Sequence, residues 1–361
     1  MTLLMFESLG GFSNAHNSTY PATQGVSMMG NAFGGTAGTG SWDLWTSGGV
    51  NTSSLGSRMN QCSQNGGWRW NLGSANTNTC FTGARLNFNT FGSAVTRDFF
   101  QIWDSAGAVQ CGMSINSSAK LIFWRGTNST VIGTGTTTII GGVEYFIEVG
   151  IPLGNSVTIE VRINGVTEIT ASTVDTTNTA NQNWQYFWWS CGSGQTCLYT
   201  DIYGLDSGGS APHNTFLGVC RIETLPVTTN NSVTWTALSS TNASQVDDTG
   251  TLGTSTIDSD TTYNKTSTTS NVDTFNHSAL TSNPTTIFGV KVQTIVRKED
   301  VGNRTYRNKL ISGGTTSSGT TVQTYTGYMT QDDYYTTDPN TSAAWTATNV
   351  NATKIGYELV S

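Results

Sequence analysis

The sequence predicts an all-β protein: an antiparallel jelly-roll β-sandwich followed by a second, smaller β-sandwich-like domain with one short helix near the C-terminus. Three observations support this prediction. Only 11% of the 361 residues are charged, and glycine, serine, threonine and asparagine are abundant instead. The chain contains 11 Trp, 12 Tyr and 14 Phe, whereas disordered chains are poor in aromatic residues. Short apolar runs recur about every 8–12 residues between turn signals, as in sandwiches and barrels.

Two domains are expected because the chain is longer than the roughly 250–300 residues at which a single hydrophobic core stops growing. A dense Gly/Ser/Pro cluster follows a complete set of strands at residues 207–218, which we interpret as the linker. The jelly roll then covers residues 1–206, and the smaller β-domain covers residues 219–361.

Strands of the first domain are predicted from alternating or continuous apolar runs. Asn164-Gly165 joins two of these runs and is the strongest short-range hairpin signal that a sequence offers. Glu144 and Glu148 share one face of their strand, where we expect both to be solvated. The predicted strands are 84–91, 99–103, 108–115, 119–124, 143–149, 156–163, 166–172, 182–190 and 198–205.

The second domain is expected to continue with short strands and to contain the helix. Pro339 and Thr341 or Ser342 could start this helix, and Gly356 would end it before a last strand. The strands predicted before it are 219–227, 287–297, 304–312 and 320–329.

The charge pattern excludes several classes of partner. The net charge is −7 and neither half is basic, so we expect no nucleic acid. The one cationic cluster, within residues 297–309, is diluted by Glu299 and Asp300 and is interpreted as a solvated hairpin. No run approaches the about 18 apolar residues of a membrane-spanning helix, so no membrane insertion is expected. MTLLMFESLGG lacks the features of a secretory signal, yet the polar, uncharged composition is typical of a protein that works outside a cell.

Six cysteines leave two interpretations open. Cys191 and Cys197 bracket a short loop, and Cys62 and Cys80 bracket a tryptophan-containing segment. Neither spacing is a zinc pattern. These cysteines are paired if the protein works in an oxidising medium, or they are inert thiols.

Loose motifs follow one another along nearly the whole chain: MTLLMFESLGGF, INGV, YTDIYGLDSGG, NTFLGVCRIETLPV, VDD…DSDTTYN…VDTF, VKVQTIVRKEDVGNRTYRNKLISGG and DPNTSAAWTATNVNATKIGYELV. Together they resemble a family of virion proteins from tailed bacteriophages and prophages. In that family a concanavalin A-like (laminin G-type) jelly roll precedes a smaller β-domain. The chain departs from the family where an aspartate follows the glycine that opens the second domain, since Val219 and Cys220 stand there. No role of that carboxylate is carried over.

The resemblance implies a structural protein that is assembled in the bacterial cytoplasm and displayed on the virion, as a decoration or appendage of the capsid or tail. Its partners would be other virion proteins and further copies of the same chain, with host surface glycans as a further candidate. The alternative is a carbohydrate-active tail enzyme that resembles a polysaccharide depolymerase. A secreted lectin of cellular origin is disfavoured by the missing export signal.

Catalytic patterns are absent, and the sequence therefore predicts a protein that is not an enzyme. His16, His213 and His277 occur in polar, turn-like contexts, and no pattern around them brackets a nucleophile. The paired-carboxylate run of sandwich glycosidases is missing. Glu144 and Glu148 would lie about 13 Å apart along a strand, outside the about 5–9.5 Å that glycosidases use.

No cofactor is expected, with calcium as the alternative. Calcium takes several oxygen ligands from converging loops. Acidic pairs in turns usually cap or are solvated, and this is our interpretation of the four candidate pairs. They are Asp247 with Asp248, Asp258 with Asp260, Asp332 with Asp333, and Asp201 with Asp206.

Asp201 and Asp206 are predicted to be structural. Asp201 lies in the closing strand at the alternation position that Tyr199 and Tyr203 share, so tyrosine hydroxyls could satisfy it. Asp206 starts a turn, where aspartate commonly accepts a bond from its own backbone two residues on.

Two groups of aromatic residues are candidate binding residues. Trp42, Trp45, Trp68 and Trp70 lie in glycine-rich context and could face a glycan, or they could plug the open end of the sandwich.

Strict alternation along QNWQYFWWS places Phe187 and Trp189 on the face opposite Trp184, Tyr186 and Trp188. We expect that outer face to be an interface with the C-terminal domain or a neighbouring subunit. A merely exposed aromatic pair is the alternative.

Overall fold

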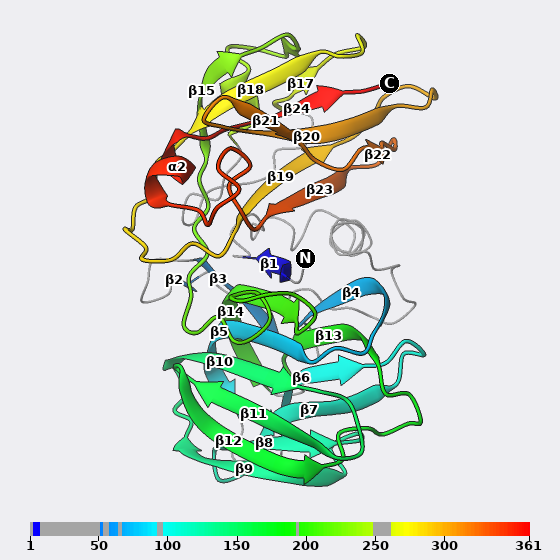
Figure 1. Cartoon of the computed structure of the whole chain (residues 1–361), viewed down its shortest axis with the longest axis vertical. Coiled ribbons are helices and arrows are strands. Elements are labelled where there is room, and N and C mark those ends of the chain that lie inside the picture. The colour runs from blue at the N-terminus through cyan, green and yellow to red at the C-terminus, as the bar shows by residue number, and fades with distance from the viewer. Residues whose placement is uncertain are drawn as a thin grey trace. The chain divides into compact units, whose positions relative to one another are not determined.

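The computed structural model describes residues 3–7, 51–52, 58–63, 67–91, 97–192, 195–247 and 261–361, and nearly all of its elements are strands. The all-β prediction is therefore confirmed. The chain divides into two compact units, Met1–Ile222 and Glu223–Ser361, and Figure 1 labels most of their elements. Among the described residues, no helix is long and apolar enough to cross a membrane.

One sheet of the first unit, the back sheet, has eight antiparallel strands. They run in the order β12-β11-β10-β5-β14-β3-β2, and β1 pairs with β14. Their bounds are β1 (Leu3–Glu7), β2 (Asn51–Thr52), β3 (Arg58–Ser63), β5 (Cys80–Phe91), β10 (Glu144–Ile151), β11 (Val157–Ile163), β12 (Val166–Val174) and β14 (Gln195–Asp206). Asn164 and Gly165 both have positive φ, which the tight turn between β11 and β12 requires.

The other sheet, the front sheet, has six strands in the order β4-β13-β6-β7-β8-β9. Their bounds are β4 (Gly67–Asn76), β13 (Trp184–Ser190), β6 (Arg97–Trp103), β7 (Val109–Ile115), β8 (Lys120–Arg125) and β9 (Thr130–Thr138). Large side chains from both sheets are fully buried between them. They include Leu86 and Phe88 from the back sheet and Phe100, Met113, Phe123 and Trp189 from the front sheet.

The segment after β14 packs on the outer face of the back sheet. We call residues 216–222 the strap. Phe146, Tyr203 and Leu205 form a small cluster on that face, against which Leu217 and Cys220 of the strap pack. The compact units divide at Ile222/Glu223, so the structure assigns to the first unit the residues 207–218 that the sequence suggested as a linker.

A six-stranded antiparallel sheet forms the centre of the second unit. Its strands are β15 (Val227–Ser232), β18 (Val272–His277), β24 (Lys354–Leu359), β20 (Thr305–Ser312) and β21 (Thr315–Ser318), with β22 (Val322–Gln323) paired to β20. Two smaller pairs are β16 (Thr236–Ala237) with β17 (Asn264–Lys265) and β19 (Val290–Val296) with β23 (Met329–Tyr335). The core has two clusters, one around Phe275, Tyr306 and Tyr357 and one around Leu310 and Trp345.

The helix near the C-terminus is shorter than its sequence signals suggested. A 3-10 turn, η2 (Ala243–Gln245), precedes it in the chain, and α2 itself covers Ala347–Ala352. Thr346 caps α2 by accepting a hydrogen bond from the Asn349 N–H at 3.1 Å. Residues 338–343 form a turn instead, because the buried Asp338 carboxylate accepts hydrogen bonds from the Asn340 N–H at 2.9 Å and the Thr341 hydroxyl at 3.2 Å.

Cys80, Cys111, Cys191, Cys197 and Cys220 carry thiols and form no disulfide. Burial raises the pKa of the Cys80 and Cys111 thiols. A thiol that keeps its proton is a poor nucleophile. Of the two interpretations of the cysteines, inert thiols therefore describe Cys80 and Cys111.

Candidate functional site

The outer face of the front sheet carries one continuous row of side-chain positions. Residues that are directly opposite in an antiparallel pair lie on the same face. One row across β13, β6, β7 and β8 consists of Trp188, Gln101, Gly112 and Trp124. The neighbouring row, Trp189, Phe100, Met113 and Phe123, is fully buried in the sandwich core. The first row therefore lies on the face that points away from the core.

Aromatic rings and amide groups lie together at one end of this face. The Trp103 and Trp188 rings meet edge to face with centroids 5.9 Å apart. Tyr186 is directly opposite Trp103, and all three side chains are half-buried. Trp103 Nε1 donates to Gln101 Oε1 at 2.9 Å, and Gln185 Nε2 donates to the Tyr186 hydroxyl at 3.3 Å. The face thus offers ring surfaces with hydrogen-bonding groups beside them.

A carboxyl group, Asp98, lies on the same outer face, opposite Ser114 in the β6–β7 pair. Its Oδ1 accepts hydrogen bonds from the Ser114 hydroxyl and, at 3.1 Å, from Asn128 Nδ2. Trp124 Nε1 donates to Ser114 Oγ at 2.6 Å. Burial raises the pKa of the Asp98 carboxyl, although the hydrogen bonds from Ser114 and Gln101 oppose the shift. Such a group holds its proton at higher pH than an ordinary aspartate.

Gly112 provides the space in which the Trp124 ring lies. A Cβ atom at Gly112 would lie 2.6 Å from the ring carbon Cζ2 of Trp124. The ring is fully buried although its position belongs to the outer face. A larger residue than glycine would therefore displace the ring and, with it, the hydrogen bond from Trp124 to Ser114.

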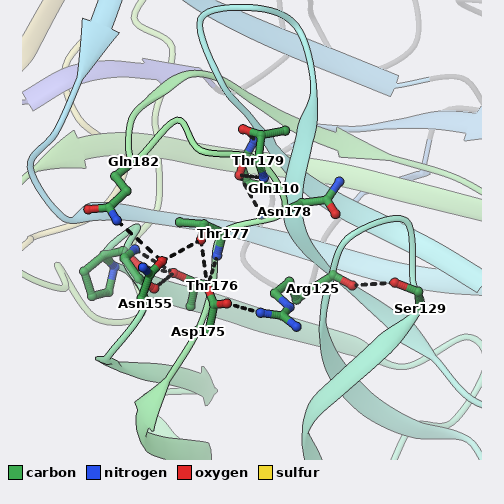
Figure 2. A network of polar contacts seen from close by, with 12 residues as sticks. Gln110, Arg125, Ser129, Asn155, Asp175, Thr176, Thr177, Asn178, Thr179 and Gln182 are labelled. Atoms are coloured by element: carbon green, nitrogen blue, oxygen red, sulfur yellow. Dashed lines mark hydrogen bonds and ion pairs between the residues drawn. The ribbon is translucent and has the colours of Figure 1, made fainter.

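Loops at the end of the front sheet are fixed by two aspartates, as Figure 2 shows in part. Asp175 forms an ion pair with Arg125 and accepts from the Thr177 N–H at 2.9 Å. Asp104, which is fully buried, accepts from the Thr179 hydroxyl at 2.9 Å and from Gln110 Nε2 at 2.8 Å. The same carboxylate accepts hydrogen bonds from its own turn, donated by the N–H groups of residues 106 and 108. These contacts link the turn after β6 and the residues after β12 to this end of the sheet.

Two of the four predicted glycan-facing tryptophans can be placed. Trp70 is 2% exposed and stacks on Phe187 with centroids 5.1 Å apart, so its indole belongs to the sandwich core and cannot face a glycan. Trp68 lies in β4, opposite Trp189 of β13. Trp42 and Trp45 lie outside the described residues.

The prediction that Phe187 and Trp189 form an interface is wrong, because both side chains are fully buried in the core. The pairing of β13 with β4 shifts register between Trp184 and Tyr186. This irregularity turns Trp184 inward together with Phe187 and Trp189, and it leaves Tyr186 and Trp188 on the outer face. An extra residue in one strand has this effect on alternation.

Asp201 and Asp206 have structural partners. Asp206 accepts from the Gly208 N–H at 2.8 Å, which confirms the predicted turn. Asp201 has φ +52° at an irregularity in the β14–β5 pairing. Its partners include Arg85, whose Nε lies 2.8 Å from Oδ2, and this ion pair was not expected from the sequence.

The other acidic candidates are placed in part. Asp333 accepts from the Thr320 N–H and from Asn308 Nδ2. Asp332 accepts from Gln293 Nε2. Asp248, Asp258 and Asp260 lie outside the described residues. Within the described ranges, no group of three or more His, Cys, Asp or Glu side chains could hold a metal ion.

Glu148 is not solvated, contrary to expectation: its side chain is fully buried. The sequence also gave no indication of Asp98, Gln101, Trp103, Tyr186 and Trp188 as one group. The dense aromatic run of β13 was the available signal, but the core lies on the side of Phe187 and Trp189, so Tyr186 and Trp188 face outward.

Comparison with known proteins shows solved structures whose fold is similar to part of this chain. No protein-family model matches the chain, and no curated protein matches it. A solved cellulose-induced protein is 16% identical with a TM-score of 0.34, over 45% of this chain and 87% of that chain. An endo-β-1,4-glucuronan lyase from Trichoderma reesei is 11% identical with a TM-score of 0.35, over 46% and 92%. An alginate lyase is 11% identical with a TM-score of 0.33, over 44% and 82%.

These matches correct one prediction. The sequence suggested a protein that is not an enzyme, whereas the structures it resembles include two polysaccharide lyases and several sialidases. The chain spans 29% of one such sialidase, from Trypanosoma rangeli. At identities this low the likeness concerns the fold alone, and the reactions of these enzymes are not assigned to this chain. The prediction that this chain has no catalytic activity is therefore withdrawn.

Proposed function

We propose that this chain is a structural component of a tailed-phage particle whose first unit attaches to glycans of the host surface. The virion assignment rests on the motifs that resemble phage virion proteins. The glycan assignment rests on the outer face of the front sheet, where Trp103, Tyr186 and Trp188 stand beside the amides of Gln101 and Gln185.

A sugar ring presents C–H groups on its faces and hydroxyl groups around its edge. Half-buried aromatic rings suit the first, and amides suit the second because they both donate and accept hydrogen bonds. The side chains project from paired strands rather than from loops, so their spacing is fixed before binding. This pre-organised group of rings and amides is the observation that carries the glycan proposal.

Titration of host surface polysaccharide into the full chain tests the glycan part by calorimetry. Trp188→Ala and Trp103→Ala should each weaken binding by about tenfold, which corresponds to about 1.4 kcal/mol. Tyr325→Ala is the matched control, because Tyr325 is 58% exposed in the second unit. Unchanged affinity of both tryptophan variants would remove this face from the proposal.

Particle location tests the virion part separately. Antibodies against the chain should label purified particles in electron micrographs, on the capsid or on the tail. Consistent absence of the chain from purified particles would contradict the virion assignment, whatever the glycan result.

A carbohydrate-active tail enzyme is the second candidate, and Asp98 is the observation that favours it. A carboxyl group that holds its proton can donate it to a leaving oxygen. Burial raises the pKa of the Asp98 carboxyl, and Asp98 lies on the same face as the aromatic rings. If the candidate is right, the full chain generates new polysaccharide ends, and Asp98→Asn abolishes this cleavage while binding persists. Absence of cleavage by the unaltered chain would eliminate the candidate.

A further inference from the structure

Two buried carboxyl groups hold the strap on the back sheet. Glu148 Oε1 accepts hydrogen bonds from the Gly218 N–H at 2.8 Å and from the Tyr203 hydroxyl at 2.6 Å. Asp201 Oδ1 accepts from the Ile222 N–H at 3.0 Å. The strap backbone is also attached by Arg85 Nη2, which donates to the Cys220 carbonyl at 3.1 Å, and by the Leu217 N–H, which donates to the Tyr203 hydroxyl at 3.3 Å.

Aromatic contacts complete the attachment of the strap. The Phe216 ring meets the Phe81 ring edge to face at 5.0 Å, and the Arg162 guanidinium lies 4.0 Å from the Phe216 centroid. A Cβ atom at Gly150 would lie 2.8 Å from the Phe216 ring, so this glycine allows the ring to approach the sheet.

The two carboxylates differ in how their charge is compensated. Asp201 faces Arg85, with Nε and Oδ2 2.8 Å apart and both side chains buried. Glu148 is fully buried as well, but its Oε2 has no hydrogen-bond partner. The nearby guanidinium of Arg162 is bonded to Glu160 instead, with Nε 2.8 Å from Oε1. An ionised Glu148 is therefore a buried charge without a direct counter-ion.

We infer that the strap is a pH-responsive clasp that docks firmly while Glu148 is protonated and loosens when Glu148 is ionised. The inference does not depend on the proposed function. The strap ends at Ile222, and the second unit begins at the next residue, Glu223. Its release would therefore lengthen the free connection between the two units.

The direction follows from the groups that face Glu148. Burial raises the pKa of its carboxyl, while the Tyr203 hydroxyl, the Gly218 N–H and the Arg162 charge act against the rise and the Glu160 charge adds to it. Once the strap has left, Glu148 would meet water and return towards the ordinary value of about 4.3. The docked state therefore binds its proton more tightly than the released state.

This difference defines the pH window. Docking free energy is fully present below about pH 4.3. It falls as the pH rises from there to the raised pKa of the docked carboxyl, and it is constant above that value. Two other ionisable groups lie against Glu148: burial raises the pKa of the Tyr203 hydroxyl and of the Cys220 thiol, so neither ionises within the window.

Hydrogen exchange of the Gly218 amide in the full chain tests the clasp. Protection, corrected for the intrinsic dependence of exchange on pH, should fall by up to about tenfold for each pH unit inside the window. In Glu148→Gln, protection should be independent of pH. Glu160→Gln is the matched control, because it removes a neighbouring carboxylate and should keep the pH dependence. The Phe123 amide reports global unfolding and should stay constant.

Two results would overturn the inference: a wild-type Gly218 amide whose protection is the same from pH 4 to pH 8, or an equal fall in Glu148→Gln. The wild-type profile decides the question by itself if Glu148→Gln does not fold.

Discussion

Replacing Asp201 with asparagine isolates the contribution of one buried charge. Arg85 and Asp201 have side chains that are 6% and 0% exposed, and Arg85 Nε lies 2.8 Å from Asp201 Oδ2. Asparagine keeps the size of the side chain and an oxygen that can accept from the Ile222 N–H. It also tolerates the left-handed backbone at φ +52°. The substitution therefore removes charge with little other change, and leaves the Arg85 guanidinium buried without a counter-ion.

Removing one partner of a buried ion pair costs about 3–5 kcal/mol. We expect about 3 kcal/mol, the lower end, because the hydrogen bond to the strap survives. For a unit of this size, that loss lowers Tm by about 6–12 °C. Urea unfolding followed by tryptophan fluorescence measures it, since Trp124, Trp184 and Trp189 are buried in the first unit.

The double variant Arg85→Met with Asp201→Asn should recover most of the loss, because no uncompensated charge remains. Asp300→Asn is the surface control: it breaks the exposed pair with Arg304 and should change stability by less than about 1 kcal/mol. A loss below about 1 kcal/mol in Asp201→Asn would refute the reasoning that this ion pair holds the outer face of the back sheet together.

Three further outcomes follow from the first unit. Trp189→Ala should lower the free energy of unfolding by about 3–5 kcal/mol, whereas Trp188→Ala should lower it by less than about 1 kcal/mol; equal losses in urea titrations would contradict the assigned faces. Gly83→Ala places a Cβ 2.5 Å from the Tyr203 ring, so thermal unfolding should show a loss of about 1–3 kcal/mol. Burial raises the pKa of the Asp104 carboxyl, but its hydrogen bonds outweigh burial and the net pKa is lowered. Its stabilisation should be complete above about pH 3.9 and disappear as the pH falls through the lowered pKa, and an Asp104→Asn variant with the same acid unfolding curve as the wild type would refute this.

Much of the fold was predictable because it depends on local patterns. Alternating apolar residues gave the strands, and Asn164-Gly165 gave a turn whose two residues both have positive φ. Which side chains of each strand point into the core was not predictable. Register shifts near Trp184 and at Asp201 change which residues face inward, and neither carries a sequence signature. Tyr199 and Tyr203 illustrate the effect: Tyr199 contacts Trp189 in the core, while Tyr203 joins the outer cluster.

The candidate site depends on which side chains face outward, so it could not be predicted from the sequence. Trp103 and Trp188 are 85 residues apart in the sequence and meet only because β6 pairs with β13. The raised pKa of the Asp98 carboxyl comes from burial, which no local pattern reports. Trp70 was misassigned for a related reason, since its glycine-rich context suggested a loop where β4 forms.

The strap sets the smallest fragment of this protein that should be able to fold alone. A chain shortened to Asp206 would keep every strand of both sandwich sheets but would uncover Phe146 and Tyr203 and remove the backbone donors of Gly218 and Ile222. Such a fragment should bind hydrophobic dyes and aggregate, whereas one that ends at Ile222 should be monodisperse. Anyone who dissects the chain, or fuses another domain to its first half, would therefore cut after Ile222 and not at the glycine-rich turn that follows β14.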